Sequence, residues 1–457
     1  MGADREADLL SMAAAQGRLL SVAAIDTQEA ERVDRKLFRR LILPIGLLTF
    51  VNSIDRVNIS YAGHAMAQEI GLTPEAFGLG VSAFFVAYLL FQYPHARLLR
   101  IMGVRLWIFT AMLLWGVAGL GMARVQTAGE FYAARFLLGV AEAGFAPGMT
   151  YFISQWVPRS SRATAMAGAL SAVPLSMVLG GPLCGWLLGI GNPVGLSPWR
   201  WMFLMQAIPN FLIAGIAAAY FVDRPSQARW LAPAERASLT QRLAEEEGAA
   251  PSPSEPSRWA LARDPWVWRC CVTWLLVMTG SYALVFWLPQ LVRQLGVGQS
   301  EFAIATLSAL PQLGMVCGLL LNGRHSDKSS ERIWHVGIAT ALAGVAMLVA
   351  AFLPTGWPVL LLLIAAGTGI GAAQGVFWTI PSTVRIGGET APVGVIALIS
   401  MFGTAGGIVG PLLTGEILSR TGSFAPAIAI LAALLILSLF VLILDGSGRG
   451  RRPAVDA

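Results

Sequence analysis

Long apolar segments alternate with short polar ones along most of this chain. Twelve of the apolar segments approach or exceed the length of about 20 residues that a helix needs to cross a bilayer. Their apolar residues are continuous and do not occupy every second position, which favours helices over the strands of a membrane barrel. The predicted spans cover residues 41–62, 76–94, 104–123, 130–153, 163–190, 199–222, 266–290, 301–322, 333–353, 357–380, 392–419 and 424–444.

One long polar interruption, residues 223–265, divides the spans into two sets of six. Its middle, EEEGAAPSPSEP at 245–256, has the composition of a linker. We therefore predict an all-α membrane protein with 12 transmembrane helices in two pseudo-symmetric six-helix bundles. The predicted parts are a cytosolic N-terminal tail (1–40), an N-terminal bundle (41–222), a central cytosolic loop (223–265), a C-terminal bundle (266–444) and a cytosolic C-terminal tail (445–457).

Two short motifs repeat between the halves at nearly the same offset. RLW at 105–107 recurs as RIW at 332–334, an offset of 227, and GPL at 181–183 recurs as GPL at 410–412, an offset of 229. Each copy falls at the corresponding place in its half, after the second span or within the fifth. The repeat indicates two similar bundles with a binding site between them near the membrane midplane, which rock to give alternating access.

Composition and charge place the chain in a membrane. Only 13% of the residues are charged and the mean hydropathy is +0.64, whereas soluble domains average about 25% charged residues. Of the 32 lysines and arginines, 26 fall on one side of the predicted spans and four on the other. This asymmetry predicts a multi-pass membrane protein with both termini in the cytosol.

The same charge count limits the partners. The net charge of +6 reflects loops at the lipid surface, so we expect no nucleic-acid partner. The sequence has no metal-ligand spacing and no cofactor motif, so we expect neither a metal nor a cofactor. The lipid bilayer is the partner that the composition predicts. Nothing in the sequence requires an oligomer, so we expect a monomer.

Two predicted spans contain charged residues far from either end. Asp55 and Arg56 are adjacent in the first span, and Arg135 and Glu142 lie two helical turns apart in the fourth. An ionised side chain at the membrane centre costs roughly 2.5–3.5 kcal/mol on insertion scales, so such residues usually face a protein interior or a water-filled path. Charges out of water need partners, and the simplest pairing crosses between the two spans.

These residues have a functional and a structural interpretation. We expect Asp55 and Glu142 to carry protons, because burial favours the neutral form of a carboxyl group unless an arginine opposes it. We expect Arg56 and Arg135 to bind a substrate carboxylate or to hold the two acids, because the guanidinium is a planar fork of donors. In the structural interpretation, Asp55 and Arg56 neutralise each other or lie near the membrane surface, and Arg135 extends to the interface.

Uncharged polar and aromatic residues within the spans are further candidates for lining a substrate path. In the first half they are Asn52, Tyr88 and Gln92, and in the second half Tyr282, Trp287, Gln290, Gln312, Gln374, Trp378, Ser400 and Thr404. Each of them alone is more often a helix-packing residue or an interfacial anchor.

Five segments together resemble the major facilitator superfamily. They are 52–58 (NSIDRVN), 82–94 (SAFFVAYLLFQYP), 135–148 (RFLLGVAEAGFAPG), 180–186 (GGPLCGW) and 323–335 (GRHSDKSSERIWH). Within it, the chain resembles the anion:cation symporter family, especially its tartrate, phthalate and hydroxyphenylacetate permease-like branch. The resemblance runs from about residue 35 to 445 and implies proton-coupled uptake of organic carboxylates across a bacterial inner membrane. It also implies proton coupling at Asp55 and Glu142, and a charge network and substrate site that include Arg56, Arg135 and Tyr88.

The chain departs from the family pattern at two places. Arg100 stands after the second span, where the superfamily usually has an aspartate that the second half keeps as Asp327. In span eleven, Ser400 and Thr404 stand where the family commonly has asparagine, which with Trp287 and Trp378 suggests an aromatic or larger carboxylate. The predicted cytosolic gate consists of Arg100, Arg105, Gly323, Asp327 and Arg332.

The favoured interpretation is a proton symporter for a small organic anion. An anion exchanger could use the same arginines without net proton coupling. A membrane sensor could keep the fold and only bind the ligand, but the sequence has no large extra domain or recognisable output module. An enzyme is not expected, because the spans contain no nucleophile–base pair, metal set or phosphate loop.

Overall fold

A computed structural model describes residues 32–191, 194–248, 264–383, 385–386, 389–390 and 393–443. The predicted terminal tails up to residue 31 and from residue 444, and the linker at 249–256, lie outside the described residues. Within the described part, eleven helical segments are long and apolar enough to cross a membrane. One of them, Pro74–Arg124, contains both the second and the third predicted spans.

The N-terminal half is a bundle of helices, several of which are broken. It consists of the π-helix η1 (Phe38–Ile42) and the α-helices α2 (Leu43–Val57), α3 (Ile59–Ile70), α4 (Pro74–Arg124), α5 (Ala128–Glu142), α6 (Phe145–Trp156), α7 (Arg159–Leu170), α8 (Ala172–Gly189) and α9 (Pro198–Tyr220). The connection to the second half contains η2 (Pro225–Gln227) and α10 (Pro233–Gly248).

The C-terminal half is a second bundle of helices. It consists of α12 (Pro265–Gln294), α13 (Glu301–Ser329), α14 (Ile333–Phe352), α15 (Trp357–Phe377), α16 (Thr379–Thr383), α17 (Val393–Thr421) and α18 (Ala425–Ile443). Two strands of two residues each, β1 (Arg385–Ile386) and β2 (Glu389–Thr390), pair antiparallel between α16 and α17.

Local sequence explains where the long helices begin and turn. The hydroxyls of Thr73, Thr127 and Ser300 accept a backbone N–H in the first turn of α4, α5 and α13, respectively. Helix α4 runs through most of the residues between its two predicted spans and departs from helical geometry at Gly103, where φ is +75°. A glycine suits this conformation because it has no Cβ to clash with the backbone.

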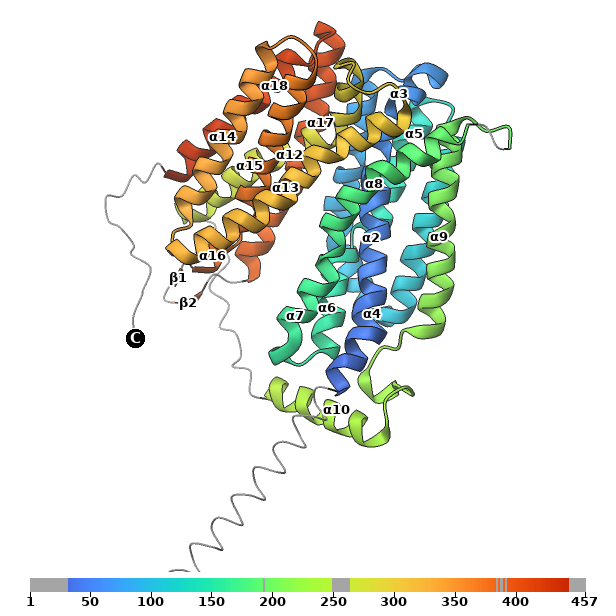
Figure 1. Cartoon of the computed structure of the whole chain (residues 1–457). Coiled ribbons are helices and arrows are strands. Elements are labelled where there is room, and N and C mark those ends of the chain that lie inside the picture. Colours follow the sequence, from blue (N-terminus) through green and yellow to red (C-terminus); the bar gives the residue numbers. More distant parts are fainter. Residues whose placement is uncertain are drawn as a thin grey trace, which may run out of the picture.

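The two bundles meet at the end of the molecule opposite α10 and diverge toward α10 and α16 (Figure 1). The contacts between bundles are made chiefly by α4 with α17 and by α8 with α13. In terms of the predicted spans, the second contacts the eleventh and the fifth contacts the eighth. A two-fold axis that relates the two halves would produce this pair of contacts. At this closed end the Ser82 hydroxyl donates to the Ile408 carbonyl over 2.7 Å, and Gly78 lies against the Pro411 carbonyl.

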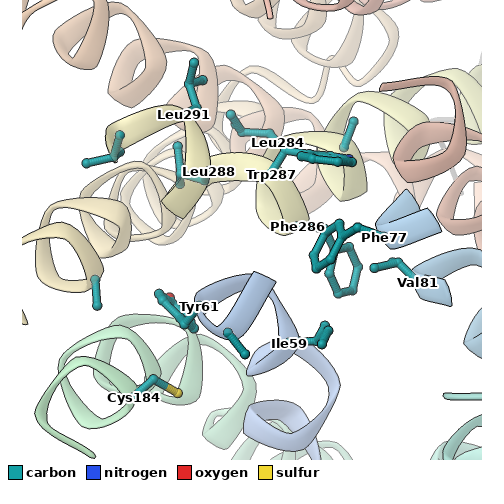
Figure 2. Packing of buried hydrophobic residues seen from close by; sticks show 14 of the residues in the cluster. Ile59, Tyr61, Phe77, Val81, Cys184, Leu284, Phe286, Trp287, Leu288 and Leu291 are labelled. Carbon is teal, nitrogen blue, oxygen red and sulfur yellow. The ribbon is translucent and has the colours of Figure 1, made fainter. Parts of the chain in front are cut away.

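Aromatic side chains fill the closed end. Phe77 of α4 packs edge-on against Trp287 of α12, with 4.9 Å between ring centroids, and Phe286 lies beside them (Figure 2). The Trp287 indole N–H donates to the Pro411 carbonyl over 3.1 Å. Trp287 is therefore a buried residue of the closure, which differs from its predicted place in the substrate path. A large aromatic in mid-span fits either role, and the burial that decides between them comes from α4 and α17.

Helix α10 docks on the N-terminal bundle. The Lys36 ammonium donates to both oxygens of Glu235, at 2.6 and 2.7 Å. This hydrogen-bonded ion pair holds the pKa of Glu235 below its usual range. Trp230 stacks on Trp156 with 5.9 Å between centroids, and Leu239 is fully buried. The central segment is thus partly a structured helix, although its sequence suggested a polar loop.

The turn between α13 and α14 is held by polar contacts. Arg332 forms an ion pair with Asp327 at 2.8 Å. Burial alone would raise the pKa of Glu331, but hydrogen bonds from the N–H groups of Trp334 and His335 and from the His335 ring outweigh it and lower the pKa. The first-half counterpart differs, because the Arg105 N–H donates to Asp223 over 3.0 Å and so ties α4 to the end of α9.

Candidate functional site

The intramembrane charges lie where helices break. The first span changes from α2 to α3 at Asn58, three residues after Asp55, and the fourth changes from α5 to α6 just after Glu142. Arg56 sits in the last turn of α2, where the negative end of the helix dipole favours a cation. Broken helices in the middle of a membrane protein commonly mark a binding site, because freed backbone groups and side chains face the interior there.

Arg56 and Glu142 form an ion pair across the two spans. Nε and Nη2 of Arg56 both donate to Oε2 of Glu142, at 3.3 and 3.1 Å. The Glu142 side chain is fully buried, whereas 24% of the Arg56 side chain is exposed. Asn52 lies beside the Glu142 carboxylate one helical turn before Arg56. One face of this arginine is therefore paired inside the bundle while another remains accessible.

Asp55 belongs to a separate hydrogen-bonded group. Nδ2 of Asn210, on α9, donates to Oδ2 of Asp55 over 2.7 Å. One turn away on α9, Gln206 accepts from Nδ2 of Asn58 over 2.7 Å and donates to Sγ of Cys184 over 3.2 Å. Adjacent residues on a helix point in different directions, so Asp55 and Arg56 have different partners.

Gln206 and Asn210 are absent from the sequence-based candidates. Both are buried, the stretch 201–219 around them is otherwise apolar, and their spacing of four residues puts them on one helix face. Two amide side chains at this spacing were the feature of the sequence that could have identified them as candidates. The sequence contains no indication that their partners lie about 150 residues earlier in the chain.

Aromatic rings support both arginines. The Arg56 guanidinium carbon lies 5.0 Å from the Tyr88 ring centroid and 5.5 Å from that of Phe84. Arg135 lies over the same Phe84 ring at 4.8 Å and is only 1% exposed. Nε and Nη2 of Arg135 have no hydrogen-bond partner among the described residues. A partly accessible arginine and a fully enclosed one therefore both lie near the Phe84 ring, and cation–π attraction stabilises both positions.

The C-terminal bundle contributes aromatic and polar groups. Tyr282 of α12 packs against Phe85 at 4.7 Å and interacts electrostatically with Arg56 and Tyr88. Nε2 of Gln374 donates to the Ser281 hydroxyl over 3.0 Å. Arg56, Tyr88 and Tyr282 thus converge from both bundles.

For the other predicted residues, no hydrogen bond or ring contact to Arg56, Tyr88 or Tyr282 is seen among the described residues. Trp378, which is 36% exposed, contacts the Trp274 ring at the break between α15 and α16. The Thr404 hydroxyl donates back to the Ser400 carbonyl within α17. No hydrogen bond of Gln92 is seen in the described part of the chain, and Arg100 is exposed near the end of the first half of α4. A Cβ at Gly323 of α13 would meet nothing within 4 Å.

A search of the described residues finds no group of three or more His, Cys, Asp or Glu side chains that could hold a metal ion. The site consists instead of two carboxylates, two guanidiniums, amides and aromatic rings. Such a set can bind an anion through Arg56 and hold or release a proton at the carboxylates.

Comparisons with known proteins agree with the fold and with a transport role. The model of a family described as the Major Facilitator Superfamily matches residues 45–385. A protein of Agrobacterium vitis named "Putative tartrate transporter" is 38% identical over 410 residues, covering 90% of this chain and 94% of that protein. A "Quinolone resistance transporter" of Acinetobacter baumannii is 33% identical, with the same coverage of the two chains.

A solved structure supports the architecture. The crystal structure of a D-xylose-proton symporter has a TM-score of 0.69 with this chain and 15% sequence identity, covering 88% of this chain and 97% of that one. This likeness concerns the fold alone. Together with the family match and the membrane-length helices, it confirms the predicted fold class of two helical membrane bundles.

Proposed function

The chain belongs to the major facilitator superfamily, and from this premise we propose that it is a proton-coupled symporter that takes up a small organic carboxylate by alternating access. Members of the family are membrane transporters, so the protein is a transporter and not an enzyme. Beyond this, we propose the class of substrate, the coupled ion and the orientation of the protein in the bacterial inner membrane.

The observation that carries the proposal is the position of Arg56. Of the four predicted intramembrane charges, Asp55, Arg135 and Glu142 are almost completely enclosed, whereas the Arg56 side chain is 24% exposed and lies over the Tyr88 ring. A guanidinium that is only partly neutralised attracts a carboxylate and can hold it through two parallel hydrogen bonds. We place the substrate carboxylate at Arg56.

Proton coupling follows from the Arg56–Glu142 pair. A substrate carboxylate at Arg56 competes with Glu142 for the same donors. Once its partner turns away, Glu142 is a buried carboxylate without a cation, and protonation is then its least costly state. Substrate binding and proton binding would thus favour each other. Asp55, held by Asn210, is the second candidate proton carrier.

Alternating access is supported by the arrangement of the bundles. They are packed together at one end and diverge toward α10 (Figure 1). Basic residues are concentrated at the α10 end, which the positive-inside rule assigns to the cytosol. In this conformation the site would therefore communicate with the cytosol, and closure of the α10 end with opening of the opposite end would complete the cycle.

The names of the relatives support an organic anion as substrate. One is named a putative tartrate transporter and another a quinolone resistance transporter. Trp378 of the C-terminal bundle is 36% exposed at the break between α15 and α16 and offers ring surface there, while its neighbours Trp274 and Phe377 are buried against it. This favours carboxylates that carry an aromatic or other large apolar group.

Proteoliposome uptake tests the proposal. The panel contains tartrate, benzoate, phthalate and hydroxyphenylacetate, each measured with an inward proton gradient and with no gradient. We expect at least one carboxylate to accumulate with the gradient, and the accumulation to collapse when a protonophore is added. Uptake that ignores the gradient but requires anion inside the vesicle would make the protein an exchanger and would overturn the symport proposal.

Lysine in place of Arg56 should weaken substrate binding. The Arg56→Lys variant keeps the charge but loses the planar fork and its stacking on Tyr88, so we expect KM for the transported carboxylate to rise roughly tenfold to a hundredfold. Arg420→Lys is the control, because Arg420 pairs with Glu416 on an exposed helix turn. An unchanged KM in Arg56→Lys would contradict direct contact between Arg56 and the substrate.

A further inference from the structure

A small cavity lies inside the N-terminal bundle beside Asp55 and Arg135. Its polar lining consists of Asp55, Asn58, Trp115, Arg135 and Gln206. Neither Arg56 nor Glu142 lines it. The volume in which the centre of a water molecule fits is about 10 Å³, close to the minimum that holds one water.

Several polar atoms of this lining lack a partner. Nε and Nη2 of Arg135, Nε1 of Trp115 and Oδ1 of Asn58 are buried without a hydrogen bond to any described residue. Leaving such groups unpaired in a protein interior costs more than forming the hydrogen bond contributes. Arg135 and Asn58 are 1% and 4% exposed, so bulk solvent cannot satisfy them.

We propose that this cavity binds one ordered water molecule, which accepts a hydrogen bond from Arg135 and donates hydrogen bonds to Asp55 and Asn58. The lining supplies both donors and acceptors, which suits water. A bound anion would face the oxygens of Asp55 and Asn58, and a bound cation would face Arg135. The available volume also excludes anything much larger than water.

The water gives Arg135 a task that needs no contact with the substrate. It connects the enclosed guanidinium to Asp55, whose other neighbour is the amide of Asn210. Arg135 is then a positioning residue for Asp55. This functional consequence rests on the proposed proton coupling, whereas the hydration site itself does not.

The first test is a crystal structure of the full chain at a resolution that shows ordered water. We expect one peak within hydrogen-bond distance of the Arg135 guanidinium and of the Asp55 or Asn58 side chain. A crystal grown in bromide tests for an anion at the same position by anomalous scattering. A bromide peak, or a cavity without density, would overturn the proposal regardless of what the protein transports.

The second test uses a variant in which an added methyl group makes the cavity smaller. A Cβ at Gly119 would lie 3.0 Å from Cβ of Ala207, and both residues line the cavity. We expect Gly119→Ala to lose the water peak. We also expect proton-driven uptake to fall roughly tenfold relative to counterflow, because a buried polar group is left unpaired. The probe is tartrate, or benzoate if tartrate gives no signal.

Gly121→Ala on the same helix is the matched control, since its Cβ would meet only Cβ of Ala134 at 4.0 Å. It should keep both the water peak and the ratio of uptake to counterflow. The link between the water and Asp55 would be contradicted by an equal fall in the ratio of uptake to counterflow in both variants. It would also be contradicted if Gly119→Ala lost the water but kept the wild-type ratio of uptake to counterflow. A wild-type protein that has the peak but ignores a proton gradient would overturn the proposed symport and leave the hydration site established.

Discussion

Proton-driven accumulation of substrate is expected to disappear in the Glu142→Gln variant, while exchange of substrate between the two sides continues. Glutamine has nearly the shape of glutamate but can neither take up nor release a proton. It still accepts a hydrogen bond from Arg56, so the site keeps its geometry. Uptake would then equilibrate the substrate without concentrating it. The measurement compares gradient-driven accumulation with counterflow in the same proteoliposomes.

The variant should still fold. Removing one partner of a fully buried ion pair costs about 3–5 kcal/mol, because the other charge is left uncompensated. Here the partner is Arg56, whose side chain is 24% exposed and lies against the rings of Phe84 and Tyr88, so the cost should be smaller. Glu416→Gln removes the carboxylate of a Glu–Arg pair outside the site and serves as the control. Full uphill accumulation in Glu142→Gln would exclude Glu142 as a proton carrier.

Hydrophobic patterning predicted the bundles well because the bilayer constrains it so strongly. A spanning helix must bury about 20 apolar residues, and this length can be read directly from the sequence. The ends of the helices were harder to predict. Helix α13 continues to Ser329 and α4 through much of 95–103, beyond the predicted spans. The apolar run ends where the helix leaves the lipid, but its backbone hydrogen bonds continue in water.

The candidate site could be predicted only in part. Charged residues within apolar spans are costly, so Arg56 and Glu142 were conspicuous, and they do form the ion pair that crosses between spans. The neighbours of Asp55 could not be derived in this way, because an amide such as Asn210 is tolerated in many helix interfaces. Likewise, Phe84 is one apolar residue among many in its span. Its contact with two guanidiniums depends on the packing of α4 against α5.

Alanine at Gly181 should shift the protein away from the conformation described above. Gly181 of α8 lies against α13 at the closed end, and its Cβ would come within 2.5 Å of the Ala305 carbonyl oxygen and 3.1 Å of the Tyr61 hydroxyl. The clash is with backbone of the other bundle, which cannot move aside by changing a rotamer. Overpacking of this kind costs typically about 1–3 kcal/mol, which is a change of roughly 5- to 150-fold in a conformational equilibrium.

That cost falls only on the conformation in which α8 and α13 touch. If alternating access separates these helices, the Gly181→Ala variant should populate the open form of this end and transport more slowly. Spin labels at Gln126 and Ser423, exposed on different bundles near this end, should then show a longer distance. Gly189→Ala on the same helix is the matched control, because a Cβ there meets nothing within 4 Å. Equal distances and rates in the two variants would mean that the α8–α13 contact does not open during transport, and the bundles would have to exchange access by another motion.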